Sequence, residues 1–528
     1  MKKYSKKLNK EHYFFILIIL IAIIFRFWKL GDIPPGLYPD IAVNGTDAIR
    51  ANENLSYQLF YPANNGREGL FINLIAVAFK IFGTGIWQLR LVGAIIGTLT
   101  VYGVYLLTKE ILDKRSALFA SLFTASSFWA VNFSRIGFRA IMVPFIIVFS
   151  LYFLLRKLND KNKSIWDFII AGVIFGLGFH TYISFRIAPL ILAIIAGYIL
   201  IYKRNLVKKY WKGILLLCIA IFIAALPILI YFQAHAADMA LRTGQVSIFN
   251  EGVNKGNFLG TLLKTTSLAF GMFNFYGDPN WRHNFSKLPD LNPIVGILFI
   301  AGIVISLKSL FTKKDKKTNQ PIDKLPYLLM ISWLIIMLIP AILTEEGMPH
   351  SLRAIGSMIP AFMLAGLGAK YLYEKFAEKK EYLVKKITVF ICSLIIIFDF
   401  SLYFVLWPKN PEVIGQFTTR YVEIAKYLNN LPSNYNKYVI VNINGTIVDG
   451  LPIPAQTIKF LAYKKSNIQY LEKESFKTAN LKSPGVIIAL ENDNEIKNMI
   501  ENKGIYNIKE STLVVPDKKI DFVIYFLE

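Results

Sequence analysis

The sequence has few cysteines and fewer acidic than basic residues, and both features narrow the class of protein. Among 528 residues there are 2 cysteines, Cys218 and Cys392, each inside an apolar run. Neither has metal-ligand spacing, so no disulfide framework and no zinc site is predicted. Asp and Glu number 35 against 59 Lys and Arg, which gives a formal net charge of +24. This excess could indicate nucleic acid binding, but the basic residues lie in short loops between apolar runs, as in membrane proteins. No nucleic acid partner is therefore expected.

Long apolar runs dominate the chain, which is 54% hydrophobic. Runs of about twenty apolar residues are typical of transmembrane helices. We predict eleven spans, at residues 13–30, 88–110, 115–133, 138–157, 165–184, 186–202, 211–232, 293–311, 325–344, 354–373 and 386–407. The first follows a basic start like that of a signal peptide. It ends in Arg26, Trp28 and Lys29 without a small-residue cleavage site, so we predict a retained helix.

The basic loops predict how the chain crosses the membrane. They lie at residues 109–115, 156–163, 203–212, 308–324 and 375–386. All five fall on the side of the N-terminus only if the apolar segment 68–82 does not cross. A helix of that length is about 22 Å long, short of the ~30 Å hydrocarbon core, so we predict an interfacial helix. The N-terminus is then cytoplasmic and the C-terminus outside, in a multi-pass protein of the cell membrane.

From about Trp407 the composition changes, and the apolar runs shorten to strand length in YVIVNI, GVIIAL and FVIYFL. Helical patterns lie between them near 418–430, 455–463 and 494–503, which favours a small α/β domain. No phosphate loop, nucleophile elbow or metal cluster occurs there, so a lid or scaffold is expected. The predicted domains are a helical transmembrane body, 1–407, with outer loops at 31–87 and 233–292, and an extracytoplasmic α/β domain at 408–528.

The first outer loop concentrates acidic and polar residues between two apolar segments. Asp40, Asn44 and Asp47 recur at spacings of four and three, so a helix starting near Asp40 would place them on one face. Glu68 stands at the start of the next apolar helix. Two interpretations of Asp40 remain open: a functional carboxylate, or only an N-cap behind Pro39.

Other polar residues face the same outer side. Arg139, Arg186 and Arg353 break the positive-inside rule at one membrane depth. Further candidates for substrate contacts on that side are Arg135, Tyr182, Asp278, Arg282, His283 and His350. Each single one could also be a solvated loop charge or a residue snorkelling from a helix end. Aromatics interleave with the polar residues of loop 233–292, which suits a sugar or lipid head group or a plain interfacial loop.

A lipid-linked phosphate donor would explain the acidic loop, the outer arginines and the apolar body together. Its polyprenyl tail would lie against the helices, and arginines would bind its phosphate bidentately. Asp40 would take the proton from an acceptor hydroxyl that attacks the sugar C1. The acceptor could be protein, lipid or glycan.

The motifs PPGLYPD, REGLF with FKIFG, WQLRLVGAIIGTLTV, FSRIGFRA, HTYISFR and MPHSLRAIG occur in this order. As an ordered set over about residues 13–373, they resemble the GT-C superfamily of membrane glycosyltransferases. More narrowly, they resemble the bacterial relatives of the protein O-mannosyltransferases and the lipid A aminoarabinose transferase. The resemblance implies a first outer loop with two surface helices. It also implies inverting transfer of a sugar from a polyprenyl-phosphate carrier to an acceptor outside the membrane.

The resemblance also implies roles for single residues. Asp40 matches the family's acid after the first helix, although Ile41 stands where members often have Glu. The segments around Arg139, Arg186, His350 and Arg353 match stretches near the donor phosphate. Some members have a carboxylate in the second outer loop and use a metal; SRIGFR has none, so no metal or other cofactor is predicted. A polyprenyl-lipid flippase or transporter, or a non-catalytic glycan-assembly protein of this fold, remains the alternative.

Overall fold

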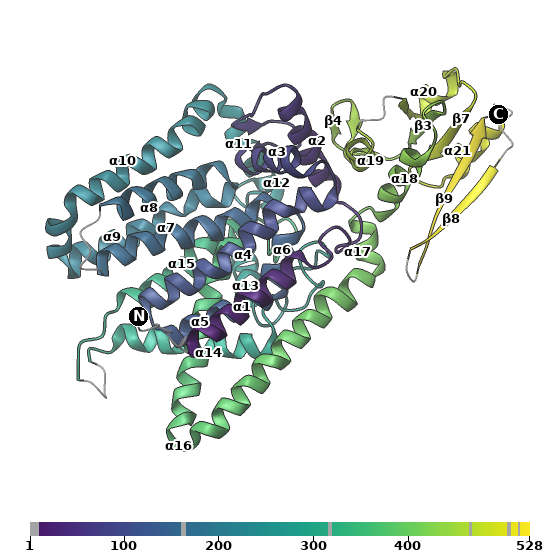
Figure 1. The fold of residues 1–528 in the computed structure, drawn as a ribbon. Helices are drawn as coiled ribbons and strands as arrows, with labels where there is room; N and C mark the ends of the chain where they lie inside the picture. The colour runs from purple at the N-terminus through teal and green to yellow at the C-terminus, as the bar shows by residue number, and fades with distance from the viewer. Residues whose placement is uncertain are drawn as a thin grey trace, which may run out of the picture.

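The computed structural model describes residues 10–159, 165–314, 319–463, 467–503, 508–515 and 518–527. A helical body carries a smaller domain at one end (Figure 1). The body's α-helices are α1 Lys10–Phe27, α2 Pro39–Glu53, α3 Leu70–Phe82, α4 Ile86–Ile111, α5 Lys114–Ser126, α6 Phe128–Arg135, α7 Met142–Asn159, α8 Trp166–Leu177, α9 Pro189–Tyr202, α10 Arg204–Ala234, α11 Ala236–Val246, α12 Glu251–Asn254, α13 Phe258–Gly271, α14 Pro293–Phe311, α15 Leu325–Ile342 and α16 Met358–Phe400. Short 3-10 helices include η1 Arg139–Ile141 and η3 Ile183–Ile187.

Within the described residues, 7 helices are long and apolar enough to cross a membrane, or 8 if the pair α5–α6, bent by 54°, forms one span. His12–Phe27 and Trp166–His180 are shorter apolar helices. Helix α16 covers most of two predicted spans, 354–373 and 386–407, which lie on either side of Lys380, where the backbone leaves helical geometry. After this kink the chain returns along the body toward the C-terminal domain (Figure 1). The chain is therefore a polytopic helical membrane protein, while the count of eleven spans and the side of each terminus stay predictions. Parts of two basic loops, 160–164 and 315–318, lie outside the described residues.

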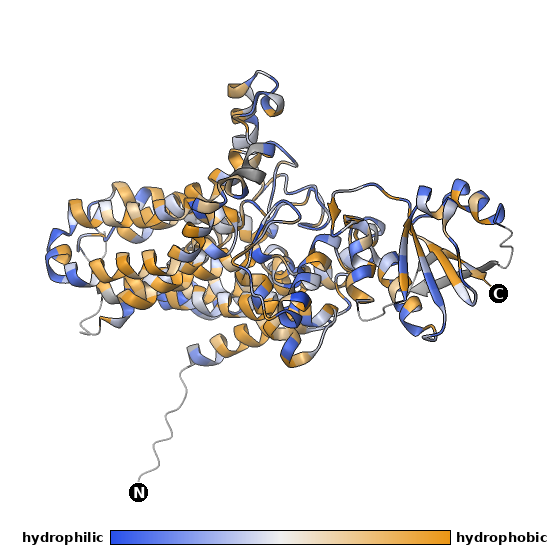
Figure 2. Ribbon diagram, turned by 90° about the horizontal axis from the view of Figure 1, so that it is seen from above, coloured by the Kyte–Doolittle hydropathy of each residue, from blue (hydrophilic) through white to orange (hydrophobic). Residues whose placement is uncertain are grey.

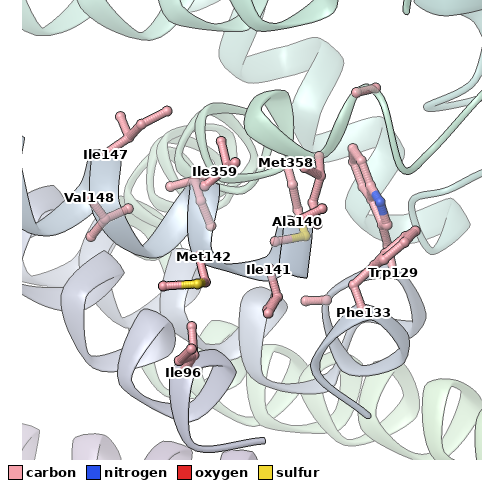
Figure 3. Close-up of a cluster of buried hydrophobic side chains, with 14 of the residues drawn as sticks. Ile96, Trp129, Phe133, Ala140, Ile141, Met142, Ile147, Val148, Met358 and Ile359 are labelled. Carbon is pink, nitrogen blue, oxygen red and sulfur yellow. The ribbon is translucent and has the colours of Figure 1, made fainter. Parts of the chain in front are cut away.

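The body packs its helices closely and keeps apolar side chains on its outside. Figure 3 shows Ile96 of α4, Trp129 of α6, and Met142 and Met358 at the starts of α7 and α16 meeting in the interior, each at most 7% exposed. Many large apolar residues of the bundle are exposed, including Phe222, Ile223, Val389 and Phe390. The bundle helices are predominantly hydrophobic along their length (Figure 2), as expected for helices in lipid.

Small residues bring α14 and α16 together. A Cβ atom added at Gly302 of α14 would overlap the backbone oxygen of Leu364. One added at Gly368 of α16 would overlap that of Leu298. Helix association inside a bilayer relies on such close van der Waals packing, because lipid tails remove the hydrophobic driving force.

The first outer loop forms a helix close to its predicted position. Helix α2 starts at Pro39, whose fixed φ suits a first helical position. Its N-cap is Tyr38, which makes no side-chain capping bond. The interpretation of Asp40 as the N-cap is therefore wrong. A small hairpin follows, with strands β1 Phe60–Tyr61 and β2 Arg67–Glu68. Helix α3 has 13 residues, about 20 Å, and buries one face against α2 and α4.

The C-terminal domain contains α17 Pro411–Gln416, α18 Thr419–Asn430, β3 Asn436–Val441, β4 Ile447–Val448, β5 Leu451–Pro452, α19 Gln456–Leu461, β6 Ile468–Glu472, α20 Lys473–Thr478, β7 Gly485–Ala489, α21 Asn494–Glu501, β8 Ile508–Val515 and β9 Lys518–Leu527. Its sheet has the order β6-β3-β7-β9-β8. β3 pairs in parallel with β6 and β7, while β9 is antiparallel to β7 and β8. The three strand-length runs correspond to β3, β7 and β9. Strands β4, β5, β6 and β8 were not predicted.

Candidate functional site

A cavity of about 590 Å³ lies between the first outer loop and the ends of several body helices. Its wall includes seven of the predicted site residues: Asp40, Glu68, Arg139, Tyr182, Arg186, His350 and Arg353. They come from α2, β2, η1, η3 with the residue that precedes it, and the segment between α15 and α16. Chain segments more than three hundred residues apart thus meet at one site, as the shared outer side predicts.

Asp40 occupies the first turn of α2 and is half-buried. Its carboxylate accepts a hydrogen bond of 2.9 Å from the side-chain amide of Asn64, a neutral donor. Next to it, burial and the negative charge of Asp40 raise the pKa of the Tyr38 phenol. The guanidinium group of Arg282 lies over the ring of Tyr38, 4.2 Å from its centroid. Arg282 therefore supports the residue beside the candidate base.

Two of the predicted arginines converge on one buried carboxylate. Arg139 Nε lies 3.0 Å from Glu68 Oε2, and Arg186 Nη2 lies 3.8 Å from Glu68 Oε1. The guanidinium group of Arg139 also lies over the ring of Tyr182, at 5.3 Å. Glu68 is only 3% exposed. The two cations are thus held side by side by a carboxylate at the cavity wall.

Arg353 belongs to a separate ion pair at the same cavity. Its Nη2 lies 2.7 Å from a carboxylate oxygen of Glu346. Its Nη1 donates to the Thr344 hydroxyl at 3.0 Å and to the Glu346 carbonyl oxygen at 2.7 Å. Arg353 is therefore fixed by the loop that precedes it, and a structural role competes with phosphate binding. The neighbouring Glu345 instead pairs with Lys264 at 3.0 Å.

Asp47 and Arg135 lie away from the cavity. Asp47 pairs with Arg67 at 2.7 Å, and Arg67 also donates to the Asn44 side chain at 2.7 Å. Burial raises the pKa of Asp47, against the opposing effect of Arg67. Arg135 is fully buried and donates to the backbone oxygen of Phe25 in the last turn of α1 and to that of Ile33 beyond the helix. Both residues stabilise the loop that carries Asp40, and neither lines this cavity.

Asp278, His283 and His350 form a cluster whose ligand atoms lie within 4.8 Å of one another. Asp278 Oδ2 is 2.9 Å from His283 Nδ1 and 3.9 Å from His350 Nδ1. These side chains are of types that can bind a divalent metal. The carboxylate of Asp278 also accepts hydrogen bonds from the backbone amides of Asn280 and Ser351. These hydrogen bonds satisfy the buried carboxylate and connect the loop of Asn280 to the loop of Ser351. Of the three residues, His350 lines the cavity.

The sequence did not single out Asn64 or Asp238, which also line the cavity. Asn64 lies in the turn Asn64–Asn65–Gly66, where all three residues have positive φ. Asn and Gly are the residues that such turns favour, so an Asn-Asn-Gly motif was the available signal. Asp238 of α11 accepts a hydrogen bond from the Tyr231 hydroxyl at 2.8 Å, and no local motif marks it.

Comparison with known proteins gives one family match, over residues 70–231, to the dolichyl-phosphate-mannose-protein mannosyltransferases. No curated protein sequence matches the chain. Among solved structures, apo ArnT from Cupriavidus metallidurans is 13% identical, with a TM-score of 0.54 over 98% of each chain. ArnT bound to undecaprenyl phosphate is 12% identical, with a TM-score of 0.52 over 97% of this chain and 98% of that one. The oligosaccharyltransferase AglB from Archaeoglobus fulgidus, in complex with an inhibitory peptide and a dolichol-phosphate, is 16% identical. Its TM-score is 0.51, over 87% of this chain and 64% of that one.

The chain spans 65% of the length of apo archaeal oligosaccharyltransferase. At these identities the likeness shows the fold alone, and that fold is shared with ArnT and AglB. The resemblance inferred from the ordered motifs is confirmed, because the mannosyltransferase family model matches residues 70–231 and ArnT and AglB share the fold.

Proposed function

We propose that this protein is an inverting glycosyltransferase that moves a sugar from a polyprenyl-phosphate donor to an acceptor hydroxyl at the outer membrane surface. The observation that carries the proposal is one cavity with the carboxylate Asp40 on α2 and the cations Arg139, Arg186 and Arg353 on other segments. The polyprenyl phosphates named for ArnT and AglB support the same class of donor. The match to mannosyltransferases supports sugar transfer.

The chemistry assigns a role to each side of the cavity. Asp40 accepts the proton of the acceptor hydroxyl. The oxygen of that hydroxyl forms a bond to sugar C1 while the bond from C1 to the phosphate oxygen breaks. The polyprenyl phosphate leaves as an anion, and Asp40 later returns its proton to solvent. General-base assistance of this kind typically contributes ~10²–10⁴ in rate. Preorganised guanidinium groups stabilise the charge that develops on the leaving phosphate.

The wall of the cavity also suits a lipid-linked substrate. Beside the charged residues it includes Ile339, Pro340, Leu343 and Phe249. An apolar flank next to a cationic region matches a prenyl chain attached to a phosphate. The cavity would open on the outer side, with the N-terminus cytoplasmic and the C-terminal domain extracytoplasmic.

We expect the reaction to need no metal. The second outer loop carries no acid in its SRIGFR segment, and arginines supply positive charge at the cavity. The cluster of Asp278, His283 and His350 serves the fold through the hydrogen bonds of Asp278.

The decisive experiment follows both halves of a donor in purified protein. A polyprenyl-phosphate sugar, labelled in the sugar, is reconstituted with the protein in lipid nanodiscs together with membrane-fraction acceptors. Release of polyprenyl phosphate with transfer of the label supports the proposal. A flippase would move the lipid across a vesicle bilayer without cleaving it, and a non-catalytic assembly protein would bind it unchanged. Either result would overturn the proposal.

A further inference from the structure

The C-terminal domain contacts the loop that carries the candidate base. We propose that this domain is a positioning element for Asp40, acting through the backbone of Leu37. The proposal rests on the proposed function, in which Asp40 is the base. The Thr418 hydroxyl donates to the Leu37 carbonyl oxygen at 2.7 Å, and the Thr457 hydroxyl donates to the same oxygen at 3.1 Å. Leu37 is 1% exposed and lies three residues before Asp40.

The Leu37 carbonyl oxygen accepts two hydrogen bonds, one more than its burial requires. A buried carbonyl needs one hydrogen bond to avoid a desolvation cost. Donors from α18's start and from α19 approach this oxygen together, which fixes the direction of the peptide group as well. The N-cap of α2, Tyr38, makes no side-chain capping bond. The position of the helix start therefore depends on contacts from outside the helix.

The neighbouring residue is held from two sides. Gly36 has φ +79°, and an added Cβ atom would overlap the carbonyl oxygen of Phe417 in the C-terminal domain. On its other side, the Gly36 carbonyl oxygen accepts a hydrogen bond of 2.6 Å from Arg90 of the helical body. The segment before Asp40 is thus clamped between the membrane body and the C-terminal domain.

The contact continues along α2. The ring of Phe460 lies against Gly45, where an added Cβ atom would overlap it. At the far end of the helix, Arg50 pairs with Asp449 at 2.6 Å, and the Tyr463 hydroxyl donates to Glu53 at 2.8 Å. Contacts at both ends of α2 fix its rotation as well as its position, so the domain sets where the Asp40 carboxylate points.

The test removes the two hydroxyls with little change in shape. Thr418→Val with Thr457→Val deletes both hydrogen bonds to Leu37, whereas the matched Thr418→Ser with Thr457→Ser retains the donors. A misplacement of about 1 Å can cost about a hundredfold in rate. We expect the double Val variant to lose between about tenfold and a hundredfold in kcat, while its KM for the donor stays within about twofold. The Ser pair is expected to recover most of the rate.

Arg420→Gln is a second control, because it breaks an ion pair with Glu491 inside the C-terminal domain and leaves the Leu37 contacts intact. A purely structural role predicts that the Val pair behaves like Arg420→Gln, with a lower Tm and an unchanged kcat per folded protein. That outcome would overturn the proposal.

Hydrogen–deuterium exchange separates this inference from the proposed function. The Val pair should speed exchange of the amides in 36–44, with the amides of 86–111 unchanged. If wild-type protein shows no transfer but exchange rises in 36–44, the proposed function fails and the positioning of the loop stands. Unchanged exchange in that segment would overturn the positioning role itself.

Discussion

Replacing Asp40 by Asn removes the proposed base while retaining most of the local structure. The Asn side-chain oxygen can still accept the hydrogen bond that Asn64 donates to Asp40 at 2.9 Å. Capping is unaffected, because the N-cap of α2 is Tyr38. The lost negative charge in the first helical turn is worth about 0.3–1 kcal/mol of stability. The variant should therefore fold and bind donor, and its chemical step should slow by ~10²–10⁴.

The assay is single-turnover transfer at saturating donor, together with titration of undecaprenyl phosphate as a probe of the phosphate site. Asp32→Asn is the matched control, since Asp32 is an exposed acid in the same outer loop. Turnover of the control should equal that of the wild type. Near-normal turnover of Asp40→Asn would refute the catalytic role. Loss of undecaprenyl phosphate binding in a folded variant would instead reassign Asp40 to donor binding.

Four further predictions concern charge and topology. Arg353→Lys should weaken undecaprenyl phosphate binding roughly ten- to a hundredfold; unchanged affinity with a lower Tm would assign Arg353 to its ion pair with Glu346. Glu68→Gln should tighten that binding in the same titration, because it removes an anion between Arg139 and Arg186; weaker binding would show that Glu68 orients them for phosphate. Incubation with EDTA should leave transfer unchanged, and a loss that Mn²⁺ restores would contradict metal independence. With an impermeant reagent on intact cells, a cysteine placed at residue 444 should be labelled and one at 161 should not; the reverse pattern would refute the topology.

Local pattern was sufficient to predict the elements that carry the site. The spacing of Asp40, Asn44 and Asp47 predicted a helix, and α2 covers all three. The short apolar segment before residue 83 forms α3. These features depend on period and length, which a sequence displays directly. Convergence of Asp40 with Arg139, Arg186 and Arg353 followed from their shared side of the membrane and from the ordered motifs.

The destinations of single charged side chains could not be predicted in this way. Arg135 and Arg139 are four residues apart, but a turn at Gly137 with φ +81° separates them. Arg135 donates to buried carbonyl oxygens, whereas Arg139 reaches Glu68 at the cavity. The two arginines look alike in sequence, because a guanidinium group can donate hydrogen bonds to backbone carbonyl oxygens as well as to carboxylates. The two hydrogen bonds from the C-terminal domain to Leu37 were equally hidden, since nothing local links residues so far apart.

The hydrogen bonds of the cavity acids also indicate which of them can act as a base. The carboxylate oxygens of Glu68 face two guanidinium groups, so its lone pairs are already directed at fixed cations. Asp238 accepts a hydrogen bond from the Tyr231 hydroxyl on its own side of the cavity. Asp40 accepts from a neutral amide and stands in the first turn of a helix held at both ends. A base must have a lone pair that an incoming hydroxyl can reach and a position that does not drift during the reaction. Asp40 and Asp238 each accept from a neutral donor, and the contacts at both ends of α2 favour Asp40 as the proposed base.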